Sequence, residues 1–290
     1  MTGHQYGNHH TLRLAADRQL GWSEYGLADG RGIVYCHGTP GSRWEFAPAA
    51  DLAAIFGLRV IVPDRPGYGA SSPSPGRTLA DFADDLAALL DHLALDQTGL
   101  LGFSGGGPHA LAAALRLPER INRLGLVSSL APFSDATTVG MPESLQQFWQ
   151  LAGSDAEAFL AMLNDGLEST DTPLDLLLAG APPEDQAIFE KTGTSAYAAS
   201  LTECLRPGLE GMLADAQALT SDWGITPKAP NCPVHLWHGS RDLNAPIAMG
   251  QWLSAHLGGI PLNQWADSAH FALFERWDQV LDTFDQSPSQ

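Results

Sequence analysis

Short apolar runs alternate with longer segments of helical periodicity along the first half of the chain. Four of these runs have the length of strands and end in turn residues: 32–38, 58–64, 98–104 and 121–129. Strands of a parallel sheet are continuous apolar runs because helices cover both faces of the sheet. The alternation therefore predicts an α/β fold with a mostly parallel sheet flanked by helices.

Three segments between these runs carry apolar residues at helical spacing: 51–57, 78–95 and 108–117. The second of them starts at Thr78, and Asp81 follows three residues later. This pair predicts a capping box, in which the threonine hydroxyl accepts the Asp81 amide and the carboxylate reaches back to the Thr78 amide.

The strand pattern stops between residues 131 and 229. Helical patterns in this part are interrupted by five prolines: Pro142, Pro173, Pro182, Pro183 and Pro207. Because proline ends or kinks a helix, the segment predicts several short helices. Beyond it the alternation resumes with strands over 231–239 and 260–270, a helix over 246–257 between them and a final helix from Phe271.

The simplest architecture is one α/β core with a helical insertion. Its predicted parts are a first core segment 1–130, the insertion 131–229 and a second core segment 230–290. The length of 290 residues is near the upper end for a single hydrophobic core, and 44% hydrophobic with 17% charged residues is ordinary for a globular enzyme.

The chain is strongly acidic. It has 15 Lys and Arg against 33 Asp and Glu, a formal net charge of −18. Phosphate groups are bound by clustered Lys and Arg, so we expect neither nucleic acid nor an anionic membrane surface as a partner. A small-molecule substrate is the expected partner, and the sequence leaves the oligomeric state open, homo-oligomers included.

The three cysteines are far apart in the sequence: Cys36, Cys204 and Cys232. Their number and spacing predict neither a disulfide framework nor a zinc site, which fits a reducing cytoplasm. The amino-terminal residues lack the basic start and apolar core of a secretory signal, and no apolar run is long enough to span a bilayer. Three histidines near the start are expected to lie in a frayed tail: His4, His9 and His10.

A serine followed by three glycines stands at the end of the strand predicted over 98–104. The segment reads LGFSGGGPHA, with Ser104 inside a G-x-S-x-G pattern and a predicted helix directly after it. A nucleophile on a sharp strand-to-helix turn needs small neighbours, and the following helix directs amides at the site. This context favours a catalytic serine over a structural turn.

A serine hydroxyl needs a base, and the base needs an acid that orients it. His270 stands where the last predicted strand ends and the final helix begins, and Asp242 follows the strand before it, so both lie at one edge of the sheet. Their order after Ser104 is the order expected for a fold of this kind. Weaker candidates among the histidines lie on a helix or within a strand: His92, His235 and His238.

A tetrahedral intermediate also needs two hydrogen-bond donors for its oxyanion. The amide of Gly105, directly after the serine, is one candidate. The second is the amide of Thr39 in the turn HGTPG, which follows the strand predicted over 32–38. Asp64, in DRPGYGAS, comes before the serine and is interpreted as part of a structural turn.

The chain resembles α/β-hydrolase fold enzymes over about residues 32–129 and 232–284. The resemblance depends on five motifs that occur in the order seen in that family: HGTPG, DRPGYGAS, GFSGGG, HGSRD and SAHF. The resemblance implies Ser104 as nucleophile, His270 as base, Asp242 as acid, and Thr39 and Gly105 as oxyanion donors. It also implies that the insertion is the helical cap of that family. HGTPGS and SGGGPHA are similar to capped hydrolases near the proline iminopeptidase group, but those enzymes usually have HGGPG and a tryptophan beside the nucleophile.

Aromatic residues of the insertion and near the serine are the candidates for contact with substrate. We expect this role for four residues: His37, Phe103, Phe133 and Trp149. Aromatic side chains suggest a small to medium, partly apolar substrate. The leading hypothesis is therefore a serine hydrolase, without cofactor or metal, that cleaves an ester or lactone through an acyl-enzyme. Three alternatives stay open: cleavage of a carbon–carbon bond (hydrolase or lyase), an aminopeptidase-like amidase, and a binding receptor with negligible turnover.

Overall fold

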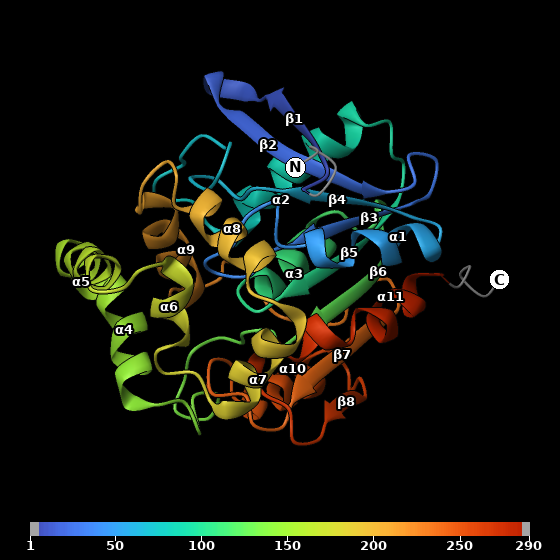
Figure 1. Ribbon diagram of the computed structural model, residues 1–290. Coiled ribbons are helices and arrows are strands. Elements are labelled where there is room, and N and C mark those ends of the chain that lie inside the picture. Colours follow the sequence, from blue (N-terminus) through green and yellow to red (C-terminus); the bar gives the residue numbers. More distant parts are fainter. Residues whose placement is uncertain (1–5, 286–290) are drawn as a thin grey trace.

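An eight-stranded sheet forms the centre of the protein (Figure 1). The computed structural model describes residues 6–285, and the sheet order is β1-β2-β4-β3-β5-β6-β7-β8. The strands are β1 (Asn8–Arg13), β2 (Gln19–Gly26), β3 (Arg31–Cys36), β4 (Leu58–Pro63), β5 (Thr98–Phe103), β6 (Ile121–Val127), β7 (Val234–Gly239) and β8 (Leu262–Trp265). All pairs from β4 to β8 are parallel, which confirms the predicted fold class.

The first two strands were not predicted from the sequence. β1 pairs antiparallel with β2, and β2 pairs antiparallel with β4. Every residue of β1 is at least partly exposed, so this edge strand has no apolar run. The expectation of a frayed tail is wrong for His9 and His10, which lie in β1; His4 lies outside the described residues. His9 bonds Ser23 on the neighbouring strand at 2.9 Å.

Helices cover the sheet on both faces, and every residue of the central strand β5 is buried. α1 (Ala50–Ile55) packs against α11 (Trp277–Asp285), α2 (Leu79–His92) packs against α3 (Gly106–Arg116), and α10 (Ile247–His256) packs on β7 and β8. Short 3₁₀ turns complete the core: η1 (Ala15–Asp17), η2 (Ala47–Ala49) and η3 (His270–Glu275). Among residues 6–285, no helix is long and apolar enough to cross a membrane.

Six helices lie between β6 and β7, all inside the predicted range 131–229, and we call them the helical insertion (Figure 1). They are α4 (Glu143–Ser154), α5 (Ala156–Glu168), α6 (Pro173–Leu178), α7 (Pro183–Thr192), α8 (Ser195–Cys204) and α9 (Glu210–Thr220). α4, α5 and α9 pack on one another, whereas α7 packs on η3 of the core. The insertion thus reaches the segment that carries His270.

The end of the chain differs from the prediction. The strand expected over 260–270 is only Leu262–Trp265, and the helix expected from Phe271 is two elements. Residues His270–Glu275 form the 3₁₀ turn η3, and α11 starts at Trp277. Because β8 ends at Trp265, a loop leads to His270 at the carboxyl edge of the sheet. A strand that continued to residue 270 would carry His270 beyond this edge.

The capping box at the start of α2 is present as predicted. Thr78 Oγ1 accepts the Asp81 amide at 3.3 Å, and Asp81 Oδ2 accepts the Thr78 amide at 2.6 Å. We expect Thr78→Ala to lower the free energy of unfolding by about 1 kcal/mol, because one amide of the first turn loses its acceptor. Urea unfolding followed by circular dichroism measures this, and Thr78→Ser, which keeps the hydroxyl, is the matched control. Equal losses in the two variants would contradict the role of the cap.

Candidate active site

Ser104 stands in a sharp turn between β5 and α3. Its φ is +52°, in the left-handed region that a residue with a side chain rarely adopts. The Ser104 amide donates to the Val127 carbonyl at 3.0 Å, which holds the turn against β6. A Cβ on Gly106 would lie 2.1 Å from the Cys36 carbonyl oxygen, so α3 can approach β3 this closely only through a glycine.

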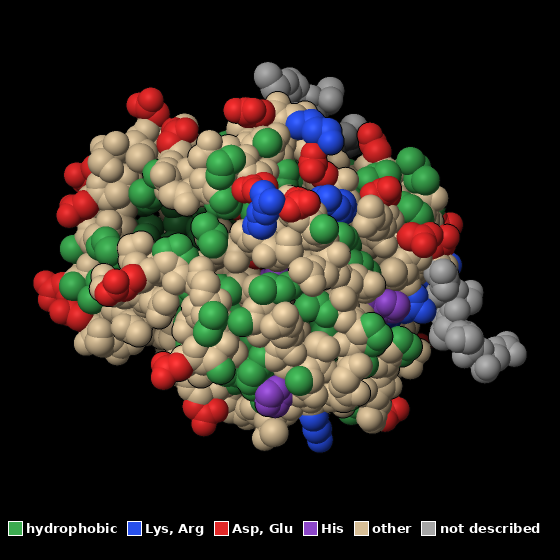
Figure 2. Space-filling view, turned by 90° about the horizontal axis from the view of Figure 1, so that it is seen from below, with side chains coloured by type: hydrophobic (Ala, Val, Ile, Leu, Met, Phe, Trp, Pro, Cys, Tyr) green, Lys and Arg blue, Asp and Glu red, His purple; other side chains and the backbone are tan. Residues whose placement is uncertain are grey.

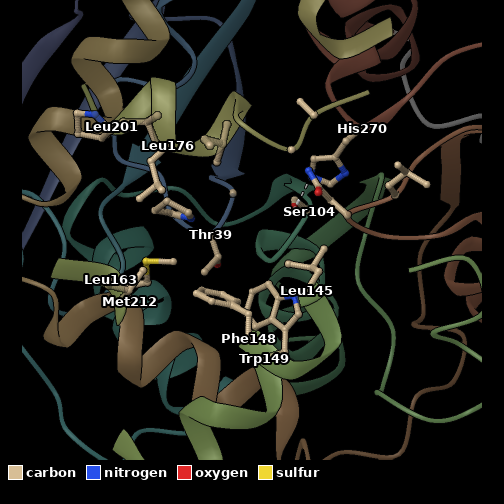
Figure 3. A pocket seen from close by; sticks show the side chains of 18 of the residues that line it. Thr39, Ser104, Leu145, Phe148, Trp149, Leu163, Leu176, Leu201, Met212 and His270 are labelled. Carbon is tan, nitrogen blue, oxygen red and sulfur yellow. Dashed lines mark hydrogen bonds between the residues drawn. The ribbon is translucent and has the colours of Figure 1, made fainter. Parts of the chain in front are cut away.

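Three side chains from separate segments form one hydrogen-bonded chain. His270 Nε2 lies 3.0 Å from Ser104 Oγ (Figure 3). His270 Nδ1 lies 2.8 Å from Asp242 Oδ2. Ser104 is 8% exposed, and His270 and Asp242 are 4% exposed each. The three residues predicted as nucleophile, base and acid are therefore brought together at the carboxyl edge of the sheet, with the geometry that nucleophile, base and orienting acid require.

The carboxylate of Asp242 is itself held by its loop. Its Oδ1 accepts the amides of Asn244 at 2.9 Å and Ala245 at 2.8 Å. His238 lies 3.4 Å from Oδ2, but its Nε2 donates to the Ala245 carbonyl at 2.6 Å. His238 thus supports the loop, in agreement with its lower rank as a base.

The charge of Asp242 governs the imidazole. Burial alone would lower the pKa of His270, but the adjacent Asp242 carboxylate outweighs it and raises the pKa above the ordinary value of 6.5. Asp185 and Glu45 add smaller contributions in the same direction. A raised pKa makes the imidazole a stronger base toward the Ser104 hydroxyl.

The loop that follows β3 lies directly against the serine turn. A Cβ on Gly105 would lie 2.3 Å from Thr39 Oγ1, so the two predicted oxyanion donors are neighbours. Glu45 Oε1 accepts the Gly38 amide at 2.8 Å and the Tyr35 hydroxyl at 2.7 Å, which ties this loop to β3. Burial raises the pKa of Glu45 to about 7.

A buried ion cluster holds the same loop from the other side, and sequence reasoning did not find it. Arg65 donates to the carbonyl oxygens of His37 and Gly38 and to Asp215 on α9. Asp215 also accepts the Thr39 hydroxyl at 2.8 Å and pairs with Arg77. Burial would raise the pKa of Asp215, but the two guanidinium groups hold it well below the ordinary range. The only signal in the sequence was an arginine directly after the predicted strand 58–64.

His37 does not contact the cavity, so its predicted contact with substrate is wrong. Its side chain is fully buried. Nδ1 lies 2.8 Å from the Gly38 carbonyl, and Nε2 accepts the Arg65 amide at 3.1 Å. The imidazole is the neutral link between two loops, and burial first and then the charge of Arg65 lower its pKa well below the ordinary value.

Asp64 has the structural place predicted for it. Its carboxylate is fully buried and accepts the amides of Arg43 at 2.6 Å and Ala70 at 2.8 Å. The Arg43 side chain also bridges Asp64 and Glu203, both at 2.7 Å. Glu203 lies on α8, so this pair is a further ionic link between the core and the helical insertion.

A cavity of about 460 Å³ opens over Ser104, between the core and the insertion. Figure 3 shows Ser104 and His270 on one side of it, Leu163, Leu201 and Met212 on the opposite side, and Thr39 between them. Among the described residues that line it there is no Asp, Glu, Lys or Arg. The cavity can therefore bind an apolar group by burial, and apart from the imidazole of His270, which is paired with Asp242, its lining has no ionisable partner for an ion.

Besides His37, three aromatic residues were predicted to line the cavity, and two of these three predictions hold. Phe103 and Trp149 line it, whereas Phe133 does not. Phe133 packs behind Trp149, with ring centroids 5.7 Å apart, because Trp149 occupies the cavity-facing position of this pair. Figure 2 shows hydrophobic side chains around a hollow on the side of the molecule where the helical insertion lies.

Within residues 6–285, no group of three or more His, Cys, Asp or Glu side chains is placed so that it could hold a metal ion. The three cysteines are free thiols, and two of them, Cys36 and Cys204, are buried. The chemistry that the described residues themselves offer at this site is nucleophilic attack by an activated hydroxyl.

Comparison with known proteins places the chain in a family. The model of the α/β-hydrolase fold family matches residues 33–276. The chain belongs to the α/β-hydrolase fold family. It is 31% identical over 248 residues to a pimeloyl-[acyl-carrier protein] methyl ester esterase of Aromatoleum aromaticum, with 82% of this chain and 90% of that protein covered. A protein of the same name from Chromobacterium violaceum is 30% identical over 249 residues, with 84% and 89% covered.

The fold comparison agrees with this result. A crystal structure of a hydrolase from Pseudomonas aeruginosa PA01 superposes with a TM-score of 0.68, and it covers 97% of this chain and 99% of that one. Its sequence is 22% identical, so this likeness supports the fold alone. With esterases and hydrolases as relatives over most of its length, the chain is a hydrolase.

The pKa of His270 predicts the acid limb of the pH profile. Neutral imidazole accepts the proton of Ser104, so kcat/KM falls as the pH drops through the raised pKa, with a midpoint above 6.5. Asp242→Asn should lower kcat by about 10²- to 10⁴-fold and move this midpoint to lower pH. Initial rates from pH 5 to 9 measure both. An acid midpoint near 4 to 5 in the wild-type enzyme would contradict His270 as the base.

The ion cluster predicts a large stability effect. Asp215→Asn leaves the buried Arg65 and Arg77 without their carboxylate, so we expect a loss of about 3–5 kcal/mol in the free energy of unfolding. Urea unfolding measures it, and Asp165→Asn, at an exposed position of α5, is the control with a change near zero. A loss no larger than that of the control would show that the cluster is not needed for stability.

Proposed function

We propose that the protein is a cofactor-independent serine esterase for uncharged, medium-sized carboxylic esters with an apolar acyl chain. The observation that carries this proposal is the hydrogen-bonded chain of Ser104, His270 and Asp242 at the edge of a cavity without charged lining residues. The two curated relatives are named as methyl ester esterases of an acyl group, which supports an ester as the bond that is cleaved.

In the proposed reaction, Ser104 Oγ attacks the ester carbonyl carbon while His270 Nε2 takes the hydroxyl proton. Asp242 stabilises the imidazolium, and His270 then gives the proton to the departing alkoxide, which leaves as the alcohol. Water attacks the acyl-enzyme with the same base, and the acid product and free Ser104 are formed. The acyl-enzyme follows from the position of the hydroxyl next to an imidazole that can serve both steps.

The amides of Thr39 and Gly105 are the proposed oxyanion donors. Neither amide has a hydrogen-bond acceptor within residues 6–285, and the two residues are in contact. Gly105 directly follows the nucleophile, and its amide belongs to the turn that leads into α3. Donors that are already in place cost no reorganisation when the negative charge develops.

The cavity supports an apolar acyl chain that runs from Ser104 past Thr39 toward the insertion (Figure 3). Burial of each methylene contributes about 0.8 kcal/mol, so kcat/KM should rise about fourfold per methylene until the cavity is filled. An ionised group at the far end would lose its hydration without gaining a partner. The lining therefore supports neutral acyl chains over chains that end in a carboxylate.

A panel of methyl esters tests the proposal. We expect kcat/KM to rise from acetate to octanoate, and the monomethyl ester of octanedioate to react about 100-fold or more slowly than octanoate. Release of acid in a pH-stat measures these rates. Met212→Trp fills the side of the cavity opposite Ser104, so it should slow octanoate and leave acetate unchanged.

Ser104→Ala is the control for the chemistry, and its activity should fall to the background rate. Undiminished turnover in this variant would overturn the assignment of the nucleophile. Equal rates for octanoate and the carboxylate-ended ester would overturn the proposed substrate class and leave the esterase assignment in place.

A further inference from the structure

The turn that carries His270 has no acceptor of its own for its first amides. η3 begins at His270, and the preceding residue, Ala269, has no side-chain hydrogen-bond acceptor. The amides of His270 and Phe271 are buried with their residues, so they need partners elsewhere in the molecule.

Asp185 on α7 of the helical insertion accepts both amides. Its Oδ1 lies 2.8 Å from the Phe271 amide nitrogen, and its Oδ2 lies 3.3 Å from that of His270. The residue is fully buried. A carboxylate from the insertion therefore holds the backbone of the residue that serves as base in the core.

The surroundings of Asp185 couple its charge to the site. The titratable groups near it on the packed elements are His270 on η3, Asp242 in the loop after β7 and Tyr197 on α8. Burial, with a smaller effect of Asp242, raises the pKa of Asp185 to about 6, and His270 and the two amides oppose this rise. Around neutral pH the carboxylate is charged, and it raises the pKa of His270 in turn.

The docking of α7 does not depend on Asp185 alone. Glu184 pairs with Arg241, and Lys191 pairs with Glu275 at 2.7 Å, both across the same interface. The Phe189 ring lies 5.0 Å from the Phe271 ring, centroid to centroid. Loss of the Asp185 charge can therefore be tested with the helix still in place.

We propose that Asp185 is a positioning residue for His270, through which the insertion sets the orientation of the imidazole by holding the amides of His270 and Phe271. The expected effect on kcat rests on the proposed function. The contact between Asp185 and the amides of His270 and Phe271 does not depend on it. The insertion would then have two roles at the site: it lines the cavity, and it orients His270.

The test compares Asp185→Asn with Glu184→Gln. Asparagine keeps the shape and one acceptor oxygen but removes the charge, whereas Glu184→Gln removes the charge from the next residue of the same helix at a position outside the site. The first measurement is the pKa of His270, from the pH titration of ¹³C-labelled histidine by NMR, with the signal assigned by its absence in His270→Gln. We expect Asp185→Asn to lower this pKa by about half a unit or more.

The second measurement is turnover of a short ester. We expect kcat of Asp185→Asn to fall about tenfold with KM within twofold of the wild-type value, and the acid midpoint of kcat/KM to move to lower pH, since misplacement of a base affects the chemical step. Glu184→Gln should match the wild type in all three quantities. Should Asp185→Asn not fold, Asp185→Ser, which keeps an acceptor, replaces it.

The outcomes separate the two proposals. A wild-type protein that neither hydrolyses esters nor reacts with a fluorophosphonate at Ser104 would refute the proposed function, and the NMR titration would still decide the role of Asp185. A reactive wild type, together with an unchanged pKa of His270 or an unchanged kcat in the Asp185 variant, would overturn the positioning role. An equal shift in Glu184→Gln would overturn it as well, because any charge on α7 would then suffice.

Discussion

The positive φ of Ser104 is the constraint on which the rest of the site depends. It turns the chain sharply between β5 and α3 and places the hydroxyl 3.0 Å from the imidazole of His270. The turn is possible only because α3 approaches β3 through glycine, where a Cβ on Gly106 would lie 2.1 Å from the Cys36 carbonyl oxygen. Strain of this kind persists when the surrounding packing holds it, and here β6 and the loop after β3 do so.

Buried carboxylates of the helical insertion connect it to both halves of the site. Asp215 on α9 binds Arg65 and the hydroxyl of Thr39, beside the serine turn. Asp185 on α7 binds the amides of the turn that carries His270. Buried charges are stable only with partners, so each of these contacts favours one arrangement of insertion and core.

Charge and apolar surface are separated in this molecule. The net charge of −18 lies on a protein whose cavity over Ser104 has no charged lining residue among those described. The acidic residues therefore lie outside the cavity lining, and in the proposed function selectivity for substrate depends on apolar burial there. The walls of the cavity are apolar on the side of the insertion, and Ser104 lies on the side of the core. This arrangement fits the proposed substrate, an apolar chain with one ester group.

Much of the core was predictable because its information is local. Continuous apolar runs predicted β3 to β7, the Thr78 box predicted the start of α2, and the glycines after Ser104 predicted the turn. The order of Ser104, Asp242 and His270 predicted a triad, since loops after parallel strands meet at one edge of the sheet. The strand β1 was missed because an exposed edge strand has no apolar run, and β2 was missed because glycine, serine and glutamate interrupt its apolar residues.

Other features depend on contacts between residues far apart in the chain. Nothing near Asp185 or Asp215 in the sequence distinguishes them from the other acidic residues of the insertion, yet each meets its partners more than eighty residues away. His37 was expected at the cavity and lies behind the loop, since only packing decides which side of a turn is buried. The sequence by itself determined which strands, turns and reactive groups exist; the tertiary structure decided which charges are buried together and which side chains face the cavity, because both depend on three-dimensional neighbours.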